Sequence, residues 1–322
     1  MTPRRRTCSA AIALFGAAAL LLAGCTSAPA EGDATAGGAS SGGASVGGDA
    51  AGGGSTAEPA APAETPAEEP AAEPEVTGVA PAELSVGGGT TVTIEGTGLS
   101  DATAVTFNGT PGTNLAVASD TSLTVVAPRS TDFQPAAADV KVLQGDAPVA
   151  STAAPVSYTV QTPVDRQLTY ALAHWNNYNV AEYGNMNPIG GDCVNFVGQT
   201  LLQRGWKMTD EWHNRAGGTE YTSAWIHVPT FDRWLRANQQ ELGITPLTLE
   251  QRDQVKPGDI VVFDWNLNDS LDHTQIVSAV EIVDGKQKIL MAGHNLDHNF
   301  RDFDNTITVE HPGAYAAFWS VP

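Results

Sequence analysis

The sequence is poor in cysteine and, over its first third, in positive charge. Cys8, Cys25 and Cys193 are the three cysteines of the 322 residues. No Lys or Arg occurs between Thr7 and Pro128. The whole chain carries 16 Lys and Arg against 36 Asp and Glu, a formal net charge of −20. A chain this acidic is not expected to bind nucleic acid or anionic lipid headgroups through charge.

Aromatic residues are missing from a long stretch near the N-terminus. Residues 26–75 consist mainly of Ala, Gly, Ser, Pro and Glu, with no aromatic residue and no Lys or Arg. Such a segment buries too little apolar surface to offset the entropy of an ordered chain. We therefore predict a disordered tether over residues 26–75, stiffer toward its Pro- and Glu-rich end.

The first 25 residues have the pattern of an export signal. Arg4, Arg5 and Arg6 precede an apolar run over residues 10–22, which is too short for a comfortable membrane span. The run ends in Leu-Ala-Gly-Cys at Cys25, which resembles the lipobox of bacterial lipoproteins. The resemblance implies a signal peptide over residues 1–25 and a fatty-acyl anchor, such as palmitate, on Cys25. It places the protein outside the cytoplasm, held on the bacterial cell membrane.

Residues 76–160 predict an all-β immunoglobulin-like sandwich. Short alternating β-branched runs are separated by Gly-rich turns, at residues 90–94, 104–107, 122–126, 140–143 and 156–160. Pro81, the Gly87–Thr90 turn, the Ile94–Leu99 run and Val105–Gly109 make the stretch similar to an IPT/TIG module. The resemblance implies a spacer or a binding platform and no chemistry of its own.

Residues 161–322 predict an α+β domain. Helical patterns cover residues 165–177, 192–204 and 230–238. Strand patterns follow at residues 260–263, 273–283, 287–294 and 315–321, with a hairpin turn at Asp284-Gly285. Helices followed by an antiparallel sheet are typical of the α+β class.

Cys193 is the candidate nucleophile of this domain. It follows Asp192, a suitable N-cap, at the start of a predicted helix, where main-chain N–H groups and the helix dipole favour a thiolate. A thiol nucleophile also needs a nearby imidazole and a third polar group that orients the imidazole. An inert, buried cysteine is the alternative.

Four motifs in order resemble the family called "Putative amidase domain", a papain-like group related to the NlpC/P60 and CHAP cell-wall hydrolases. They are Gly191–Gln199, Lys256–Val261, Leu271–Val277 and Met291–Asp297. The resemblance covers nearly all of residues 165–300. It implies a papain-like domain that hydrolyses amide bonds through a Cys–His pair.

The resemblance also implies a role for individual residues. Cys193 is the nucleophile, His273 the general base and acid, and His294 the residue that orients His273. Asn295 is the alternative for that third role, because neighbouring residues of a strand face opposite sides. The Cys193 N–H is the expected oxyanion donor, and support is expected from Asp192 and from the Tyr183 hydroxyl.

Two patterns suggest metal ligands, but each has a simpler explanation. Residues 264–272 alternate oxygen-bearing side chains as a calcium loop does, but they lack the Gly and the distant Glu of an EF-hand. His294 and His298 have an i, i+4 spacing, but no Glu follows the first His as in zinc proteases. We therefore expect neither a metal nor another cofactor.

The sequence predicts a lipid-anchored cysteine hydrolase that cleaves amide bonds of peptidoglycan, as an amidase or endopeptidase. This substrate follows from the family resemblance and the expected location. Two alternatives remain open. One is a non-catalytic cell-surface binding protein with a papain-like fold, and the other is a thiol acyltransferase that passes the acyl group to an amine.

Overall fold

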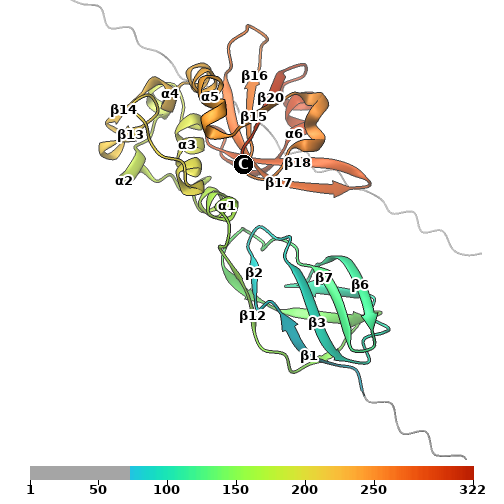
Figure 1. The fold of residues 1–322 in the computed structure, drawn as a ribbon. Helices are drawn as coiled ribbons and strands as arrows, with labels where there is room; N and C mark the ends of the chain where they lie inside the picture. The colour runs from blue at the N-terminus through green and yellow to red at the C-terminus, as the bar shows by residue number, and fades with distance from the viewer. Residues whose placement is uncertain (1–72) are drawn as a thin grey trace, which may run out of the picture. The chain divides into compact units, whose positions relative to one another are not determined.

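The computed structural model describes residues 73–322, in which an all-β part is followed by a mixed α/β part (Figure 1). The expected fold classes of both parts are confirmed. The predicted signal segment, its Cys25 anchor and nearly all of the predicted tether lie outside the described residues. Within the described part of the chain, no helix combines the length and apolar character needed to cross a membrane.

The β-sandwich has three small sheets, with strand orders β11-β1-β3-β7-β6, β10-β9-β4-β5 and β2-β12-β8. Its strands are β1 (Glu75–Ala80), β2 (Glu83–Ser85), β3 (Thr91–Thr97), β4 (Ala104–Phe107), β5 (Thr110–Pro111), β6 (Thr113–Ser119), β7 (Ser122–Val126), β8 (Ala136–Ala138), β9 (Val140–Gln144), β10 (Ala147–Pro148), β11 (Ala150–Ser151) and β12 (Val156–Thr159).

The alternation of buried and exposed residues explains which strands of the sandwich could be predicted from the sequence and which could not. In β4 and β7 every second residue is buried, including Val105, Phe107, Leu123 and Val125. This period of two is the pattern from which five of the strands were predicted. Strand β6 is almost wholly exposed, so it carries no such pattern and could not be predicted.

The α/β part begins with helices and ends with a six-stranded sheet of order β15-β20-β16-β17-β18-β19. The helices are α1 (Pro163–His174), α2 (Val180–Tyr183), α3 (Cys193–Arg204), α4 (Ser223–Ile226), α5 (Val228–Leu242) and α6 (Phe303–Asn305). The strands are β13 (Asn214–Arg215), β14 (Glu220–Tyr221), β15 (Thr245–Leu247), β16 (Ile260–Asp264), β17 (His273–Val283), β18 (Lys286–Gly293), β19 (His298–Asp302) and β20 (Tyr315–Ser320).

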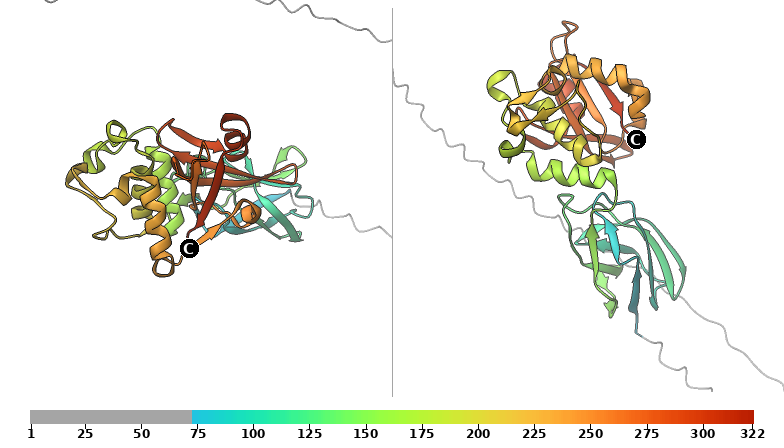
Figure 2. Two further views of the ribbon diagram at one scale, coloured as in Figure 1. Left: turned by 90° about the horizontal axis from the view of Figure 1, so that it is seen from above. Right: turned by 60° about the vertical axis from the view of Figure 1, so that its left-hand side comes forward.

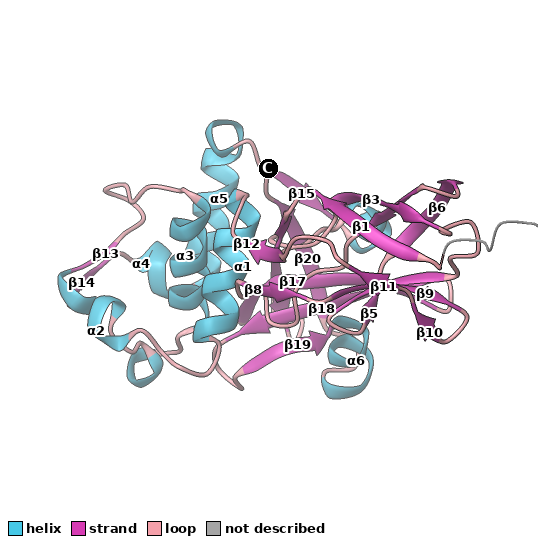
Figure 3. Ribbon diagram, turned by 90° about the horizontal axis from the view of Figure 1, so that it is seen from below, coloured by secondary structure: helices cyan, strands magenta, loops and turns pink. Residues whose placement is uncertain are grey.

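The sheet separates two hydrophobic cores. Helices α1 to α5 gather on one side of its strands, whereas α6 lies apart from them (Figures 2 and 3). The first core joins α1, α3 and α5 to the sheet through Ile260, Val262, Ile276 and Ala292. The second core is formed by the alternate residues of the same strands, which point to the other face of the sheet, among them Val261, Phe263, Val277 and Met291. This is the face that packs on α6.

Candidate active site

Cys193 is the first residue of α3 and is almost wholly buried, with 6% of its surface exposed. Main-chain N–H groups of Thr274, Val194 and Cys193 itself favour the thiolate form of its sulfur. Burial raises the pKa of the Cys193 thiol to about 11, although the N–H groups of Thr274 and Val194 act in the opposite direction. The helix start was expected to favour a thiolate, but desolvation outweighs the main-chain donors.

His273 is the first residue of β17, directly before Thr274, so the structure brings both halves of the predicted pair to the same end of β17. The side chains of Cys193 and His273, however, lie on opposite sides of the sheet. His273 is paired in register with Phe263, a residue of the second core, whereas Cys193 packs in the first core. The structure records no hydrogen bond between the Cys193 sulfur and either ring nitrogen of His273.

The surroundings of His273 are apolar and weakly cationic. Its ring centroid lies 5.7 Å from that of Trp265 and 6.3 Å from that of Phe263. Burial lowers the pKa of His273 to about 3, and the positive charge of Arg301 adds to the shift. The Nε2 atom is buried without a hydrogen-bond partner among residues 73–322. His273 is therefore a neutral imidazole in the resting domain.

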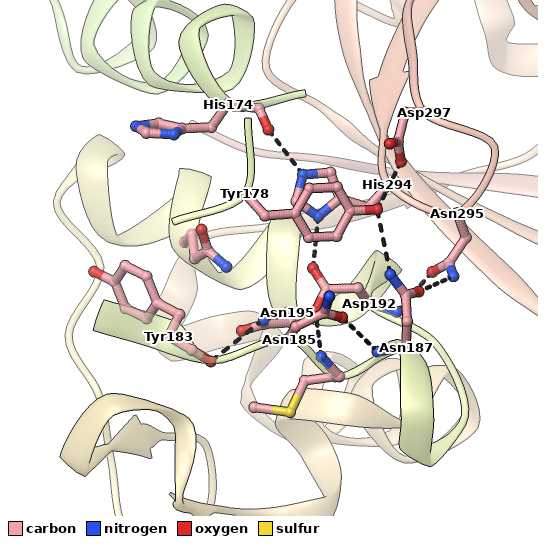
Figure 4. Close-up of polar contacts among 12 residues, drawn as sticks. His174, Tyr178, Tyr183, Asn185, Asn187, Asp192, Asn195, His294, Asn295 and Asp297 are labelled. Atoms are coloured by element: carbon pink, nitrogen blue, oxygen red, sulfur yellow. Dashed lines mark hydrogen bonds and ion pairs between the residues drawn. The ribbon is translucent and has the colours of Figure 1, made fainter. Parts of the chain in front are cut away.

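His294 follows β18 and is completely buried on the α3 side of the sheet. Its Nδ1 lies 2.5 Å from Asp192 Oδ2, and its Nε2 lies 2.8 Å from the His174 carbonyl oxygen (Figure 4). A carbonyl oxygen only accepts, so Nε2 must carry a hydrogen, and the short contact of Nδ1 with a carboxyl group requires a further proton. His294 and Asp192 thus share a buried proton and form a charge-assisted pair.

This pairing changes the roles that were expected of His294 and Asp192. Both ring nitrogens of His294 are occupied, so none is left to orient His273, and that role stays a prediction without support from these bonds. Asp192 stands at the N-cap of α3 as expected, but its side chain makes no cap hydrogen bond. Its Oδ1 accepts instead from the Met186 N–H at 2.7 Å and from Asn195 Nδ2 at 2.9 Å.

Asn295 and Tyr183 also lie close to Asp192, but neither is bonded to the predicted catalytic pair. Asn295 Oδ1 accepts from the Asp192 N–H at 2.6 Å, and its Nδ2 donates to Asn187. The Tyr183 ring stacks near Trp225 with centroids 6.4 Å apart and is directed away from Asp192 (Figure 4). Tyr183 joins the network through its carbonyl oxygen, and the contribution of its hydroxyl stays a prediction.

Sequence reasoning missed the role of Asn195. This fully buried residue donates to Asp192 and accepts from Trp225 Nε1 at 2.7 Å and from Asn214 Nδ2 at 3.0 Å. The signal was present, since Asp192 and Asn195 flank Cys193 within one turn of α3. Two polar residues that close to the candidate nucleophile, at the start of a largely buried helix, indicate a hydrogen-bond network.

The loop between β16 and β17 is held by local hydrogen bonds. Asp264 accepts from the N–H groups of Asn266 and Asn268, and Asp272 accepts from the Trp265 N–H. Within residues 73–322, no group of three or more His, Cys, Asp and Glu side chains is arranged to hold a metal ion. The loop geometry is that of a polar hairpin connection.

Comparisons with known proteins relate both parts of the chain to families. Residues 74–160 match the model described as "IPT/TIG domain", and residues 162–317 match the model described as "Putative amidase domain". The chain is 26% identical over 112 residues to "Uncharacterized protein YhbB" of Bacillus subtilis (strain 168), an alignment that covers 34% of this chain and 35% of that protein.

Among solved structures, the chain is similar to an auxiliary nutrient binding protein from Bacteroides ovatus ATCC 8483, at 22% identity and a TM-score of 0.22, over 28% of this chain and 22% of that one. A similarity at this level carries no argument. The two family models, by contrast, cover the described folds almost end to end. The chain therefore combines an IPT/TIG domain with a domain of the family described as "Putative amidase domain".

Proposed function

We propose that the α/β domain hydrolyses amide bonds, with Cys193 as the nucleophile and His273 as the general base and acid. The observation that carries the proposal is the position of Cys193 at the start of α3, where main-chain N–H groups of Thr274, Val194 and Cys193 itself favour a negative charge. Such donors suit the oxyanion that forms when a thiol adds to a carbonyl carbon. The match to the amidase family supports the same chemistry.

The shifted pKa values of both groups disfavour a resting thiolate–imidazolium pair, so the proposal places the proton transfer within the attack itself. In the proposed reaction the start of β17 rearranges so that His273 reaches Cys193 and takes the thiol proton while sulfur bonds to the amide carbon. The C–N bond then breaks, and the same proton passes to the leaving amine. Water, giving a proton to His273, cleaves the thioester, releases the carboxylic acid and restores the thiol.

The proposed substrate is peptidoglycan, at a bond within its peptides or between peptide and sugar. The proposal places the protein outside the cytoplasm, held on the membrane through a lipid on Cys25, where peptidoglycan is within reach. A cell-wall substrate is also consistent with the strongly acidic chain, because its net negative charge opposes binding to an anionic nucleic acid.

Digestion of purified peptidoglycan tests this function directly. The wild-type chain, Cys193→Ser and His273→Ala are incubated with the polymer, and mass spectrometry counts the new amine and carboxyl ends. We expect equal numbers of both ends with the wild type, none with Cys193→Ser, and a reduction of at least about a hundredfold with His273→Ala. An added amine that appears in the products would identify a transferase instead.

One observation favours a second candidate, a cell-surface binding protein without catalysis. The missing Cys193–His273 hydrogen bond and the two neutral side chains suit a fold that has kept its shape and lost its reaction. In that case wild-type and Cys193→Ser chains sediment equally with insoluble peptidoglycan, and neither produces new ends. Release of new ends by the wild type alone excludes this candidate.

A further inference from the structure

A cavity of about 580 Å³ opens beside the Asp192 network, between α2, the segment after α3, and β13. Its wall combines aromatic, amide and charged side chains, namely Glu182, Tyr183, Trp206, Lys207, Asn214 and Arg215. A hollow of this volume suits several residues of a peptide or a similar small molecule. Of the predicted site residues, Tyr183 lines it, whereas Cys193, His273 and His294 do not.

Asn214 is the buried polar residue of this wall, with 2% of its surface exposed. Its Nδ2 donates to the Tyr183 carbonyl at 2.7 Å and to Asn195 Oδ1 at 3.0 Å. The Oδ1 atom of Asn214 is buried and has no partner in the described part of the chain. Because buried acceptors are nearly always satisfied, this oxygen points to a ligand that supplies an N–H group.

The charges at the cavity favour a carboxylate as a second feature of the ligand. Lys207 is exposed and forms no ion pair within residues 73–322, and the Arg215 guanidinium lies 3.8 Å from a fully exposed Asp210 carboxylate. Glu182 is the one acid of the wall, and its carboxylate accepts from Asn179 Nδ2 at 3.0 Å. Two cations at one cavity stand out on a chain with a net charge of −20.

Hydrogen bonds connect this cavity to the candidate nucleophile. Asn214 is bonded to Asn195, which lies two residues after Cys193 on α3, a rise of about 3 Å along the helix axis. The Tyr183 carbonyl accepts from both asparagines. A ligand that contacts Asn214 is therefore connected through Asn195 to the turn of α3 that carries the thiol.

We infer that this cavity is a substrate subsite, which binds a peptide segment through an amide N–H on Asn214 Oδ1 and a carboxylate on Lys207 and Arg215. The inference rests on the proposed amide hydrolysis and names the part of the substrate that is recognised. The apolar surface of Trp206 would contact the peptide side chains that lie between the amide N–H and the carboxylate. The cavity thereby selects acidic peptides over neutral ones.

Peptides released from purified peptidoglycan, with their amines acetylated, serve as the probe. A second preparation has its carboxylates converted to carboxamides. Binding to the full-length Cys193→Ser chain is followed by tryptophan fluorescence and by calorimetry, so that no turnover is needed. We expect the acidic peptides to bind about tenfold more tightly than the amidated ones, and Lys207→Gln/Arg215→Gln to abolish the difference. Lys141→Gln, on the β-sandwich, is the matched control.

The outcomes separate this inference from the proposed function. Selective binding without any new ends from peptidoglycan supports the subsite and removes the hydrolase. New ends together with equal binding of both preparations supports the hydrolase and overturns the subsite. Where turnover occurs, the double variant is expected to raise KM about tenfold for acidic substrates and to leave kcat unchanged. An unchanged KM contradicts the inference.

Discussion

Two clusters of buried polar groups, one around Asp192 on the α3 face of the six-stranded sheet and one around His273 on the other face, differ in their hydrogen bonding. On the α3 face, Asp192, Asn195 and His294 satisfy one another and reach the main chain at Met186 and His174. On the other face, His273 Nε2 and both amide atoms of Gln275 are buried without partners in the described chain. The Asp192 cluster is hydrogen-bonded within the chain, whereas the buried groups around His273 keep atoms without a partner.

This difference bears on which histidine can do chemistry. A general base must exchange a proton, and both nitrogens of His294 are fixed in strong hydrogen bonds. His273 is neutral and free of such bonds, so it can accept a proton once a substrate and the thiol are in place. The contrast favours a structural role for His294 and leaves the proposed catalytic role to His273.

Breaking the Asp192–His294 pair has the largest expected effect. His294→Leu keeps the side-chain volume roughly but leaves the Asp192 carboxylate buried without its partner. Removing one member of a buried charged pair costs about 3–5 kcal/mol. We expect a loss of that size in the free energy of unfolding, measured by urea denaturation of the α/β domain transition at pH 7.

The matched control for this experiment is Asp192→Asn/His294→Leu, which also replaces the unpaired Asp192 carboxylate by a neutral amide. We expect it to recover part of the lost stability, because a neutral amide is less costly to bury than an unpaired carboxylate. A single variant within about 1 kcal/mol of the wild type would contradict the buried pair.

The next largest effect is expected in the rate at which the Cys193 thiol reacts with an alkylating reagent. With a pKa near 11, the thiolate fraction at pH 7 is about a hundredfold or more below that of an ordinary thiol of pKa about 8.5. We expect iodoacetamide labelling of Cys193 in the resting chain to be slower than that of a free cysteine by at least this factor. The rate should rise about tenfold per pH unit between pH 7 and pH 10.

Mass spectrometry of the peptide that contains Cys193 separates its labelling from that of Cys8 and Cys25. The chain unfolded in urea is the control, in which the same peptide should label at the ordinary rate. Fast labelling below pH 8 that slows in His273→Ala would establish a preformed thiolate–imidazolium pair, in conflict with the buried neutral thiol.

Much of this fold could be predicted from periodicity. Strands β16 and β17 and helix α3 begin at or next to their predicted first residues, because burial imposes a period of two or 3.6 on their apolar side chains. The candidate nucleophile and both histidines could also be named from their motifs. The two-residue strands β13 and β14 could not, since two residues are too few to show a period.

The details of the site depend on contacts that sequence spacing does not encode. The motif around Cys193 placed Asp192 correctly at the helix start, yet the carboxylate bonds to His294, which lies 102 residues further along the chain. The thiol pKa likewise depends on burial by residues from several elements, which outweighs the local effect of the helix start. Tertiary burial, not local sequence, decides both features.

Removing the Asn195 side chain should have an intermediate effect on the α3 face. Asn195→Ala leaves Trp225 Nε1 without an acceptor and takes one of the two acceptors from Asn214 Nδ2. An unsatisfied buried donor costs about 1–3 kcal/mol, so we expect a loss of about 2 kcal/mol in urea unfolding. Asn238→Ala, which removes one half-buried bond to the Trp234 carbonyl, is the control and should cost less than about 1 kcal/mol.

The smallest change in stability at pH 7 is expected for His273, on the unpartnered face. His273→Leu removes a buried nitrogen that has no hydrogen-bond partner and keeps the packing against Phe263 and Trp265. We expect the free energy of unfolding to change by less than about 1 kcal/mol, in either direction. This outcome would contrast directly with the large loss in His294→Leu.

Acid should reveal the difference between His273 and leucine. Burial lowers the pKa of His273 to about 3, so between pH 6.5 and pH 3 the unfolded chain binds a proton that the folded chain excludes. The free energy of unfolding of the wild type therefore falls with pH by up to about 1.4 kcal/mol per pH unit because of His273. The His273→Leu variant has no titrating group at this position and does not show this loss. We expect the variant to gain about 2 kcal/mol over the wild type between pH 7 and pH 5 in parallel urea titrations. Parallel curves for the two proteins would mean that His273 is already bonded or solvated in the folded state, and the contrast between the two faces would then fail.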